Sequence, residues 1–226
     1  MKHAPRDSRC SLAVFALVTA IATPSMAGTI ISTTGAVTPV APPPSVALGA
    51  RESNTQLIVF SERTGFALPG NVSVNLSAPG TANSANGFNP SPATLPAGTL
   101  ADIFFFHSDP VGNGPATYVG TATFSTPILG VITTAALLSA TDASLGNPGT
   151  TYPTGLAGRG PEGTDTVTLS ADRRTLSLNF TTSTAVNEVR VLTAVPEPSS
   201  LVLGAIGAGA LLAFGRPRRL RINAVA

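Results

Sequence analysis

The stretch TVTLSADRRTLSLNF, residues 166–180, contains two short segments in which apolar and polar side chains alternate. Successive side chains of a β-strand point to opposite faces, so a period of two predicts a strand with one buried face. Between the two segments, residues 170–173 (SADR) have the polar composition of a tight turn. The stretch therefore predicts a β-hairpin, and with it an antiparallel sheet.

Similar β-prone runs recur on both sides of this hairpin, separated by clusters rich in Gly, Pro, Asn and Ser. They occupy residues 54–62, 71–77, 100–108, 117–126, 127–138 and 188–193, and residues 29–41 form either a first strand or an extended lead-in. Residues 133–143 could form a short helix, but the Ile and Thr residues beside them argue against it. Eight or nine short strands with frequent turns predict an all-β domain over residues 28–195, an antiparallel β-sandwich with a jelly-roll-like arrangement.

Two segments, residues 81–96 and 147–165, predict long loops because they are rich in Gly, Pro and Asn. Long loops in compact domains are often functional. On that interpretation Phe88 in the first loop, and Tyr152 and Arg159 in the second, would be exposed contacts for a partner. The alternative is a surface loop with one side chain packed against the domain.

The first 27 residues have the layout of a secretory signal peptide. Basic residues precede an apolar run at residues 12–22, and the small residues Ser25 and Ala27 follow it. This order predicts cleavage by signal peptidase after Ala27. Cys10 is the single cysteine and leaves with the signal peptide, so the exported chain has no disulfide and no cysteine-based metal site.

The net charge of +2 is misleading, because seven of the 13 basic residues lie in the signal peptide and the C-terminal tail. The part between them, with the acid of the tail, is about four charges negative, and its arginines are scattered. Nucleic-acid binding needs a concentrated basic surface. The composition therefore argues against a nucleic-acid partner.

Catalytic candidates are few. His107 is the only histidine after the signal peptide, and it stands beside Ser108 and Asp109. Neighbouring residues of a strand point to opposite faces, so His107 and Ser108 cannot share a proton from these positions. A glycosidase needs two suitably placed carboxylates, and nothing in the spacing of the ten acids indicates such a pair. We therefore expect no enzymatic activity and no cofactor.

Calcium is the metal that the composition fits best, because it binds carboxylates and backbone carbonyls on turns. The candidate ligands are Asp142, Glu162 and Asp165, with Asp102 and Asp109 also available. None of them lies in a recognised calcium-loop pattern. Solvated or turn-capping carboxylates are the alternative interpretation.

The chain ends with three elements in a fixed order. Pro196, Glu197 and Pro198 come first, and residues 199–215 follow without a charge, which is about 26 Å of helix at the standard rise. Four arginines come next, Arg216, Arg218, Arg219 and Arg221. Positive residues stay on the cytoplasmic side, so the tail predicts one transmembrane helix with the body outside the inner membrane.

These elements at residues 195–221 resemble the PEP-CTERM sorting signal. The resemblance implies a Gram-negative bacterium and recognition by exosortase, an integral-membrane, transpeptidase-like processing enzyme. It also implies passage through the inner membrane, then release or transfer to the cell surface, and association with exopolysaccharide or biofilm. Pro217 and the tail RINAVA extend the usual ending.

The body resembles an uncharacterised group of PEP-CTERM ectodomains through PILGVI (127–132), LGNPGTTYP (145–153) and ADRRTLSLNF (171–180). This group brings no known activity. We therefore expect a surface or extracellular-matrix protein with a structural or adhesive role in biofilm. The alternative is a secreted protein that binds or degrades polysaccharide, using the long loops.

Overall fold

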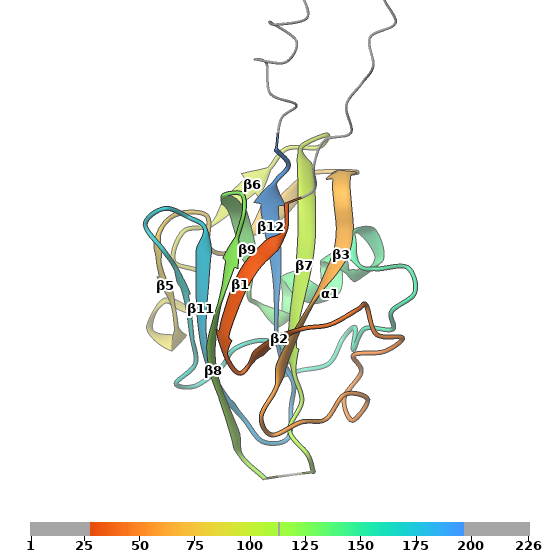
Figure 1. The fold of residues 1–226 in the computed structure, drawn as a ribbon, viewed down its shortest axis with the longest axis vertical. Coiled ribbons are helices and arrows are strands. Elements are labelled where there is room, and N and C mark those ends of the chain that lie inside the picture. The colour runs from red at the N-terminus through yellow and green to blue at the C-terminus, as the bar shows by residue number, and fades with distance from the viewer. Residues whose placement is uncertain (1–27, 113, 197–226) are drawn as a thin grey trace, which may run out of the picture.

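The computed structural model describes residues 28–112 and 114–196, and the chain folds there into two five-stranded sheets packed face to face (Figure 1). Sheet A has the order β1 (Ile30–Gly35), β8 (Ala116–Phe124), β11 (Thr175–Thr182), β10 (Thr166–Leu169) and β5 (Gly80–Ala82). Sheet B has the order β2 (Val37–Pro39), β3 (Leu57–Ala67), β7 (Leu100–Ser108), β12 (Asn187–Ala194) and β9 (Ile128–Ile132). A separate pair joins β4 (Val72–Val74) to β6 (Ala93–Leu95).

The predicted sandwich is confirmed as two packed, mostly antiparallel sheets, with one difference in pairing. All pairs of sheet A are antiparallel, but β2 and β3 pair in parallel, so sheet B is mixed. The hairpin predicted at residues 166–180 forms from β10 and β11, and the Arg173 N–H donates to the Ser170 carbonyl at 2.9 Å. The jelly-roll-like connectivity stays a prediction.

Strand β7 is buried on both faces, which explains its nearly continuous apolar sequence. Phe104 and Phe106 pack into the main core between the two sheets. Ile103 and Phe105 point the other way, into a second core that also contains Leu138. Sheet B is therefore the middle layer of the domain, with sheet A on one face and a helix on the other.

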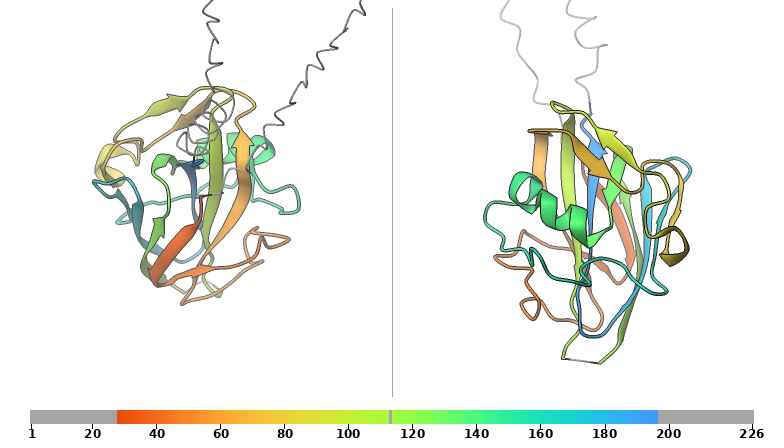
Figure 2. Two further views of the ribbon diagram at one scale, coloured as in Figure 1. Left: turned by 45° about the horizontal axis from the view of Figure 1, so that its top comes forward. Right: turned by 180° about the vertical axis from the view of Figure 1, so that it is seen from behind.

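Helix α1 (Ala135–Leu145) forms this outer layer and lies across the side of sheet B that faces away from sheet A (Figure 2). The interpretation of residues 127–138 as a strand was therefore wrong after Ile132, where β9 ends. The buried residues of the helix are Leu138, Thr141, Asp142 and Leu145, spaced as one helical face. Two of these four are polar, so the apolar stripe that indicates a surface helix is missing from the sequence.

The side chains predicted as exposed partner contacts in the two long loops are not exposed in the structure. The first contains β6 and a 3₁₀ turn (Ser84–Asn86), and its Phe88 is 9% exposed. In the second, Arg159 is 1% exposed and Tyr152 is half-buried against the second core. The alternative, a loop with a side chain packed against the domain, is confirmed for both.

The chain crosses from sheet A to sheet B at Gly35. Its φ of +62° turns β1 into β2, and the Ala36 N–H then donates to the Val119 carbonyl at 2.9 Å. Gly120 of β8 lies opposite Gly35 in the register of β1 and β8. Neither position has room for a Cβ atom, since one on Gly35 would overlap the Val119 carbonyl oxygen. Two glycines thus bring the sheets together at this corner.

The outer face of sheet A is covered by threonine side chains from neighbouring strands. Their hydroxyl groups form four pairs, Thr34–Thr121 at 2.7 Å, Thr81–Thr168 at 2.9 Å, Thr123–Thr175 at 3.1 Å and Thr117–Thr181 at 3.2 Å. Such cross-strand pairs stabilise an antiparallel sheet. They also give this face a surface of hydroxyl groups.

The first and last described residues lie at the same end of the sandwich, which we call the terminal pole (Figure 1). Gly28 contacts Asp102 of β7, and Asp102 pairs in register with Thr193 near the end of β12. The connection between β7 and β8 lies at the opposite end. The segments that precede Gly28 and follow Pro196 thus leave the domain from one end.

Candidate functional site

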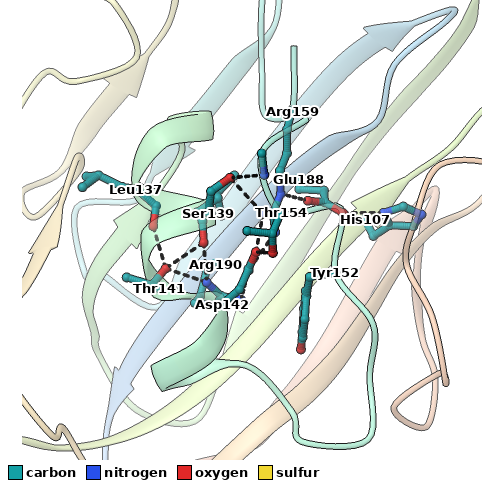
Figure 3. A network of polar contacts seen from close by, with 12 residues as sticks. His107, Leu137, Ser139, Thr141, Asp142, Tyr152, Thr154, Arg159, Glu188 and Arg190 are labelled. Carbon is teal, nitrogen blue, oxygen red and sulfur yellow. Dashed lines mark hydrogen bonds and ion pairs between the residues drawn. The ribbon is translucent and has the colours of Figure 1, made fainter. Parts of the chain in front are cut away.

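A network of charged side chains is buried between sheet B and α1 (Figure 3). Glu62 on β3, His107 on β7, and Glu188 and Arg190 on β12 share the face of the sheet that the helix covers. Every second side chain of a strand points to this face. The charged residues therefore occupy positions beside Phe60 and Phe105 where apolar side chains would be expected. Asp142 of α1 and Arg159 of the following loop complete the network.

Arg190 lies at the centre of the network and, like Glu188, has no exposed surface. Its Nε and Nη2 donate to the two carboxylate oxygens of Glu62 at 2.6 and 2.8 Å. Nη2 also donates to Asp142 Oδ1 at 3.1 Å, and Nη1 to the hydroxyl of Thr141 at 2.6 Å. One guanidinium therefore ties two strands of sheet B to the helix that covers them.

Arg159 binds the same aspartate from the loop side. Its Nη1 and Nη2 donate to Asp142 Oδ2 and Oδ1 at 2.5 and 2.9 Å, and its Nε donates to Glu188. The Thr154 hydroxyl adds a third donor to Asp142, at 2.6 Å. The loop after α1 is thus fixed to both the helix and β12.

His107 closes the network at its other end. Its Nδ1 lies 2.9 Å from Glu188 Oε1, and its Nε2 is buried without a hydrogen-bond partner among the described residues. The network contains three carboxylates and two guanidinium groups, with His107 as the sixth ionisable member.

Aromatic rings cover both guanidinium groups. The Arg190 guanidinium carbon lies 4.9 Å from the ring centre of Phe105 and 5.5 Å from that of Tyr152. Arg159 lies 5.8 Å from the ring centre of Phe105, which Tyr152 also meets edge-on at 5.2 Å. Stacking of this kind favours the cationic form in a place that water does not reach.

The shifts in pKa follow from this arrangement. Burial alone would raise the pKa of Asp142, but hydrogen bonds from Arg159 and Thr154 and the charges of both arginines outweigh it and lower the pKa. Burial opposes the charge of Arg190, yet Glu62 and Asp142 raise its pKa above the usual value. For Tyr152, burial and then the negative charge of Glu62 raise the pKa. The carboxylate and the guanidinium groups therefore stay ionised in the folded protein.

A shallow pocket of about 350 Å³ opens beside the network. Arg63, Asp142, Tyr152 and Thr154 contribute to its walls, together with the loop that follows α1. Among the described residues that line it, Asp142 is the only carboxylate, and it already accepts hydrogen bonds from two arginines and a threonine. The pocket thus lacks a free carboxyl group that could act as an acid or a base.

The predicted calcium ligands lie in two different settings. Asp142 belongs to the network, whereas Asp165 accepts hydrogen bonds from the backbone N–H groups of Glu162 and Thr181 at 2.9 and 2.7 Å. The Asn187 amide gives Asp165 a third bond, and burial raises its pKa. Within residues 28–112 and 114–196, no group of three or more His, Cys, Asp or Glu side chains could hold a metal ion.

Sequence reasoning missed Glu62, Glu188 and Arg190 as members of a site. Their alternation with apolar residues predicts a solvent-facing side of the strands, and that prediction fails because α1 covers this side. Only the helix, with Thr141 and Asp142 on its buried face, reveals that sheet B has two covered faces. Arg159 was noted in the sequence, but as an exposed contact.

Acid titration should test the ionised state of Asp142. Its folded-state pKa lies below the ordinary value of 3.8, so its contribution to stability is present above that value and is lost as the pH falls through the lowered one. We expect the unfolding free energy of Asp142→Asn, measured by urea titration between pH 6 and 3, to depend less on pH than that of the wild type.

Asp165→Asn is the matched comparison, because burial raises the pKa of Asp165 and the sign is reversed. The folded state binds the proton of the Asp165 carboxyl group more tightly than the unfolded state does. Asp165 therefore makes the unfolding free energy rise less steeply with pH. Its removal should make the slope steeper. Equal slopes for the two variants would contradict the assignment.

The remaining predicted residues lie at or beyond the ends of the described chain. Pro196 is the last described residue and is half-buried. The cleavage site at Ala27, Glu197, Pro198, the predicted transmembrane helix at 199–215 and the cluster of Arg216, Arg218, Arg219 and Arg221 lie outside the described residues. In the part of the chain that the structure covers, no helix has the length and apolarity to cross a membrane.

Comparison with known proteins gives a result for the tail only. No curated protein and no solved structure matches the chain. Residues 194–219 match the family model described as the PEP-CTERM protein-sorting motif, which begins on the last residue of β12. This motif implies processing by exosortase and a location in the cell envelope or beyond it. The chain therefore carries a C-terminal PEP-CTERM sorting motif and is an exported protein sorted by exosortase.

Proposed function

We propose that the domain is a non-enzymatic structural or adhesive component of the extracellular matrix, held in exopolysaccharide through its threonine-covered sheet. The observation that carries the proposal is the uncharged outer face of sheet A, where four hydroxyl pairs bridge neighbouring strands. Hydroxyl groups can exchange hydrogen bonds with the hydroxyls of a sugar polymer. The sorting motif supports delivery to the place where such polymers occur.

The positions of the acidic side chains support a role without catalysis. Glycoside hydrolysis needs two carboxyl groups that face a cleft. Asp142 is neutralised by two arginines, and Asp165 and Asp102 each accept hydrogen bonds from backbone N–H groups inside the domain. These carboxylates have partners within the fold rather than a substrate site.

The position of the two chain ends favours display of the domain. Both leave from the terminal pole, and the sorting motif begins at the end of β12. The outer face of sheet A runs from this pole toward the opposite end, so attachment at the tail leaves it accessible. The domain can then contact polymer while the tail is still held at the membrane.

The first test concerns delivery. Replacing Pro196, Glu197 and Pro198 with alanine should move the protein from the surface and matrix fractions into the inner-membrane fraction, measured by immunoblot of fractionated cells. A matched control replaces Thr193 with serine, just upstream of the motif. Identical distributions of the triple variant and the wild type would contradict exosortase sorting.

The second test concerns the role in the matrix. Purified protein should sediment with exopolysaccharide from the producing cells. A Thr117→Glu/Thr181→Glu variant of the exposed hydroxyl pair should sediment about tenfold less, since two carboxylates, which lack a donor, would replace the hydroxyl groups. Thr64→Glu, on an exposed site of β3 in the other sheet, is the control. Loss of binding in the control alone would overturn the assignment to sheet A.

The alternative function is a secreted protein that degrades or specifically binds polysaccharide through its loops. The pocket beside Tyr152 favours it, because an aromatic ring beside a polar wall is a common sugar contact. Release of reducing ends from the same exopolysaccharide preparation would support this alternative and overturn the non-enzymatic role.

A further inference from the structure

Another buried carboxylate, which has no contact with the charge network, lies at the terminal pole. Asp102 of β7 has no exposed surface. Its Oδ1 accepts a hydrogen bond from the Gly65 N–H at 2.7 Å, and its Oδ2 accepts one from the Gly28 N–H at 2.5 Å. Among the described side chains, no arginine or histidine forms an ion pair with it. A buried carboxylate is stabilised most by a partner of opposite charge.

Gly28 lies in a small space lined by oxygen atoms. A Cβ placed on it would lie 2.8 Å from Asp102 Oδ2, 2.8 Å from Thr126 Oγ1 and 3.1 Å from Thr193 Oγ1. The Thr126 hydroxyl is buried and has no hydrogen-bond partner in the described part of the chain. The space is thus too small for a side chain and contains more acceptors than one peptide N–H can satisfy.

Gly28 is also the residue that follows the predicted signal-peptidase site at Ala27. We propose that removal of the signal peptide gives Gly28 an α-ammonium group that forms a buried ion pair with Asp102. Hydrolysis of the Ala27–Gly28 bond consumes one water molecule. It leaves a carboxylate on the departing peptide and an amine on Gly28, which takes up a proton to become –NH₃⁺.

The new group fits the space better than the peptide N–H does. An ammonium group has three protons, one for Asp102 Oδ2 and the others for neighbouring oxygens such as the unpartnered Thr126 hydroxyl. Its positive charge also neutralises the negative charge of Asp102. In the precursor, Asp102 has only the two uncharged peptide N–H groups of Gly28 and Gly65 as donors, so removal of the signal peptide supplies its first cationic partner. The inference rests on the cleavage site and is independent of the proposed matrix role.

The sequence makes the amine easy to observe. Lys2 is the only lysine, so a chain that begins at Gly28 has a single primary amine, its own N-terminus. We would compare two chains that run to Ala226 in the same detergent, one beginning at Gly28 and one that retains Ala27. A water-soluble acetylating reagent, followed by mass spectrometry, measures the rate at which each terminus reacts.

We expect the Gly28 terminus to react at least about tenfold more slowly than the Ala27 terminus in the folded state, and equally fast in urea. Asp102→Asn should restore fast reaction to the Gly28 chain, which separates an ion pair from simple steric protection. Equal rates in the two folded chains would overturn the proposal.

A thermodynamic cycle gives an independent readout. Asp102→Asn leaves the ammonium without its partner in the Gly28 chain, but removes no charge pair from the Ala27 chain. The midpoint of thermal unfolding should therefore fall by roughly 10 °C more in the Gly28 chain. Equal falls would contradict the ion pair. Should Asp102→Asn fail to fold, Thr126→Val in both chains and the reactivity of the unsubstituted chains decide the question.

Discussion

Replacing Arg190 with alanine is expected to lower the free energy of unfolding by about 3–5 kcal/mol, the cost of breaking a buried ion pair by removing one partner. The guanidinium donates to both oxygens of Glu62 and to Asp142, and all three side chains have little or no exposed surface. Without it, Glu62 becomes a buried carboxylate with no cation on it. For a domain of this size, the unfolding midpoint should fall by roughly 10 °C or more.

Arg190→Lys is the sharper version of the experiment. Lysine keeps the charge but cannot bind both oxygens of Glu62 and reach Asp142 and Thr141 as well. It should therefore recover only a small part of the loss. The matched control is Arg174→Ala, on the exposed turn between β10 and β11, which should change stability by less than about 0.5 kcal/mol. A full recovery with lysine, seen in urea-unfolding curves, would contradict the bidentate role.

Gly35→Ala is expected to cost about 3 kcal/mol, the second largest effect. Part of the cost arises because the φ of +62° is unfavourable by about 1–2 kcal/mol for a residue with a Cβ atom. The rest arises because the new methyl group overlaps the Val119 carbonyl oxygen, to which the Ala36 N–H donates. Since Gly35 is the point where the chain changes sheets, this overlap would separate β1 from β8.

Gly98→Ala separates the two contributions. Gly98 has a φ of +80°, but a Cβ placed there meets nothing within 4 Å. It should therefore show the backbone cost alone, about 1–2 kcal/mol. Equal destabilisation by the two substitutions, measured by thermal and urea unfolding, would mean that the corner tolerates the methyl group.

The strands of the fold could be predicted because their local chemistry agrees with their final environment. The segments of the hairpin at residues 166–180 alternate, and in the structure β10 and β11 each bury one side chain in two. The run at residues 100–108 coincides with β7, whose two buried faces match its continuous apolar sequence. A strand can be predicted from its sequence when the periodicity of its apolar residues matches the faces that the fold buries.

Helix α1 and the network could not be predicted, and both failures have the same cause. Thr141 and Asp142 look like solvent-facing residues, yet they face Arg190 and Arg159. Arg190 looks solvent-facing for the same reason, because it alternates with Val189 and Val191. Each polar residue is buried only because the other is there to bind it. Pairing between residues 48 positions apart is invisible to a local pattern.

The position of β12 also determines how the domain bears tension. A pull on Ala194, where the sorting motif begins, acts along a strand that pairs with β7 on one side and β9 on the other. If the far end of the sandwich is held, β12 can move only when its hydrogen bonds to both neighbours break together, in shear. A strand at the sheet edge would instead peel away one bond at a time. The tail thus continues from a strand that is well placed to transmit mechanical load.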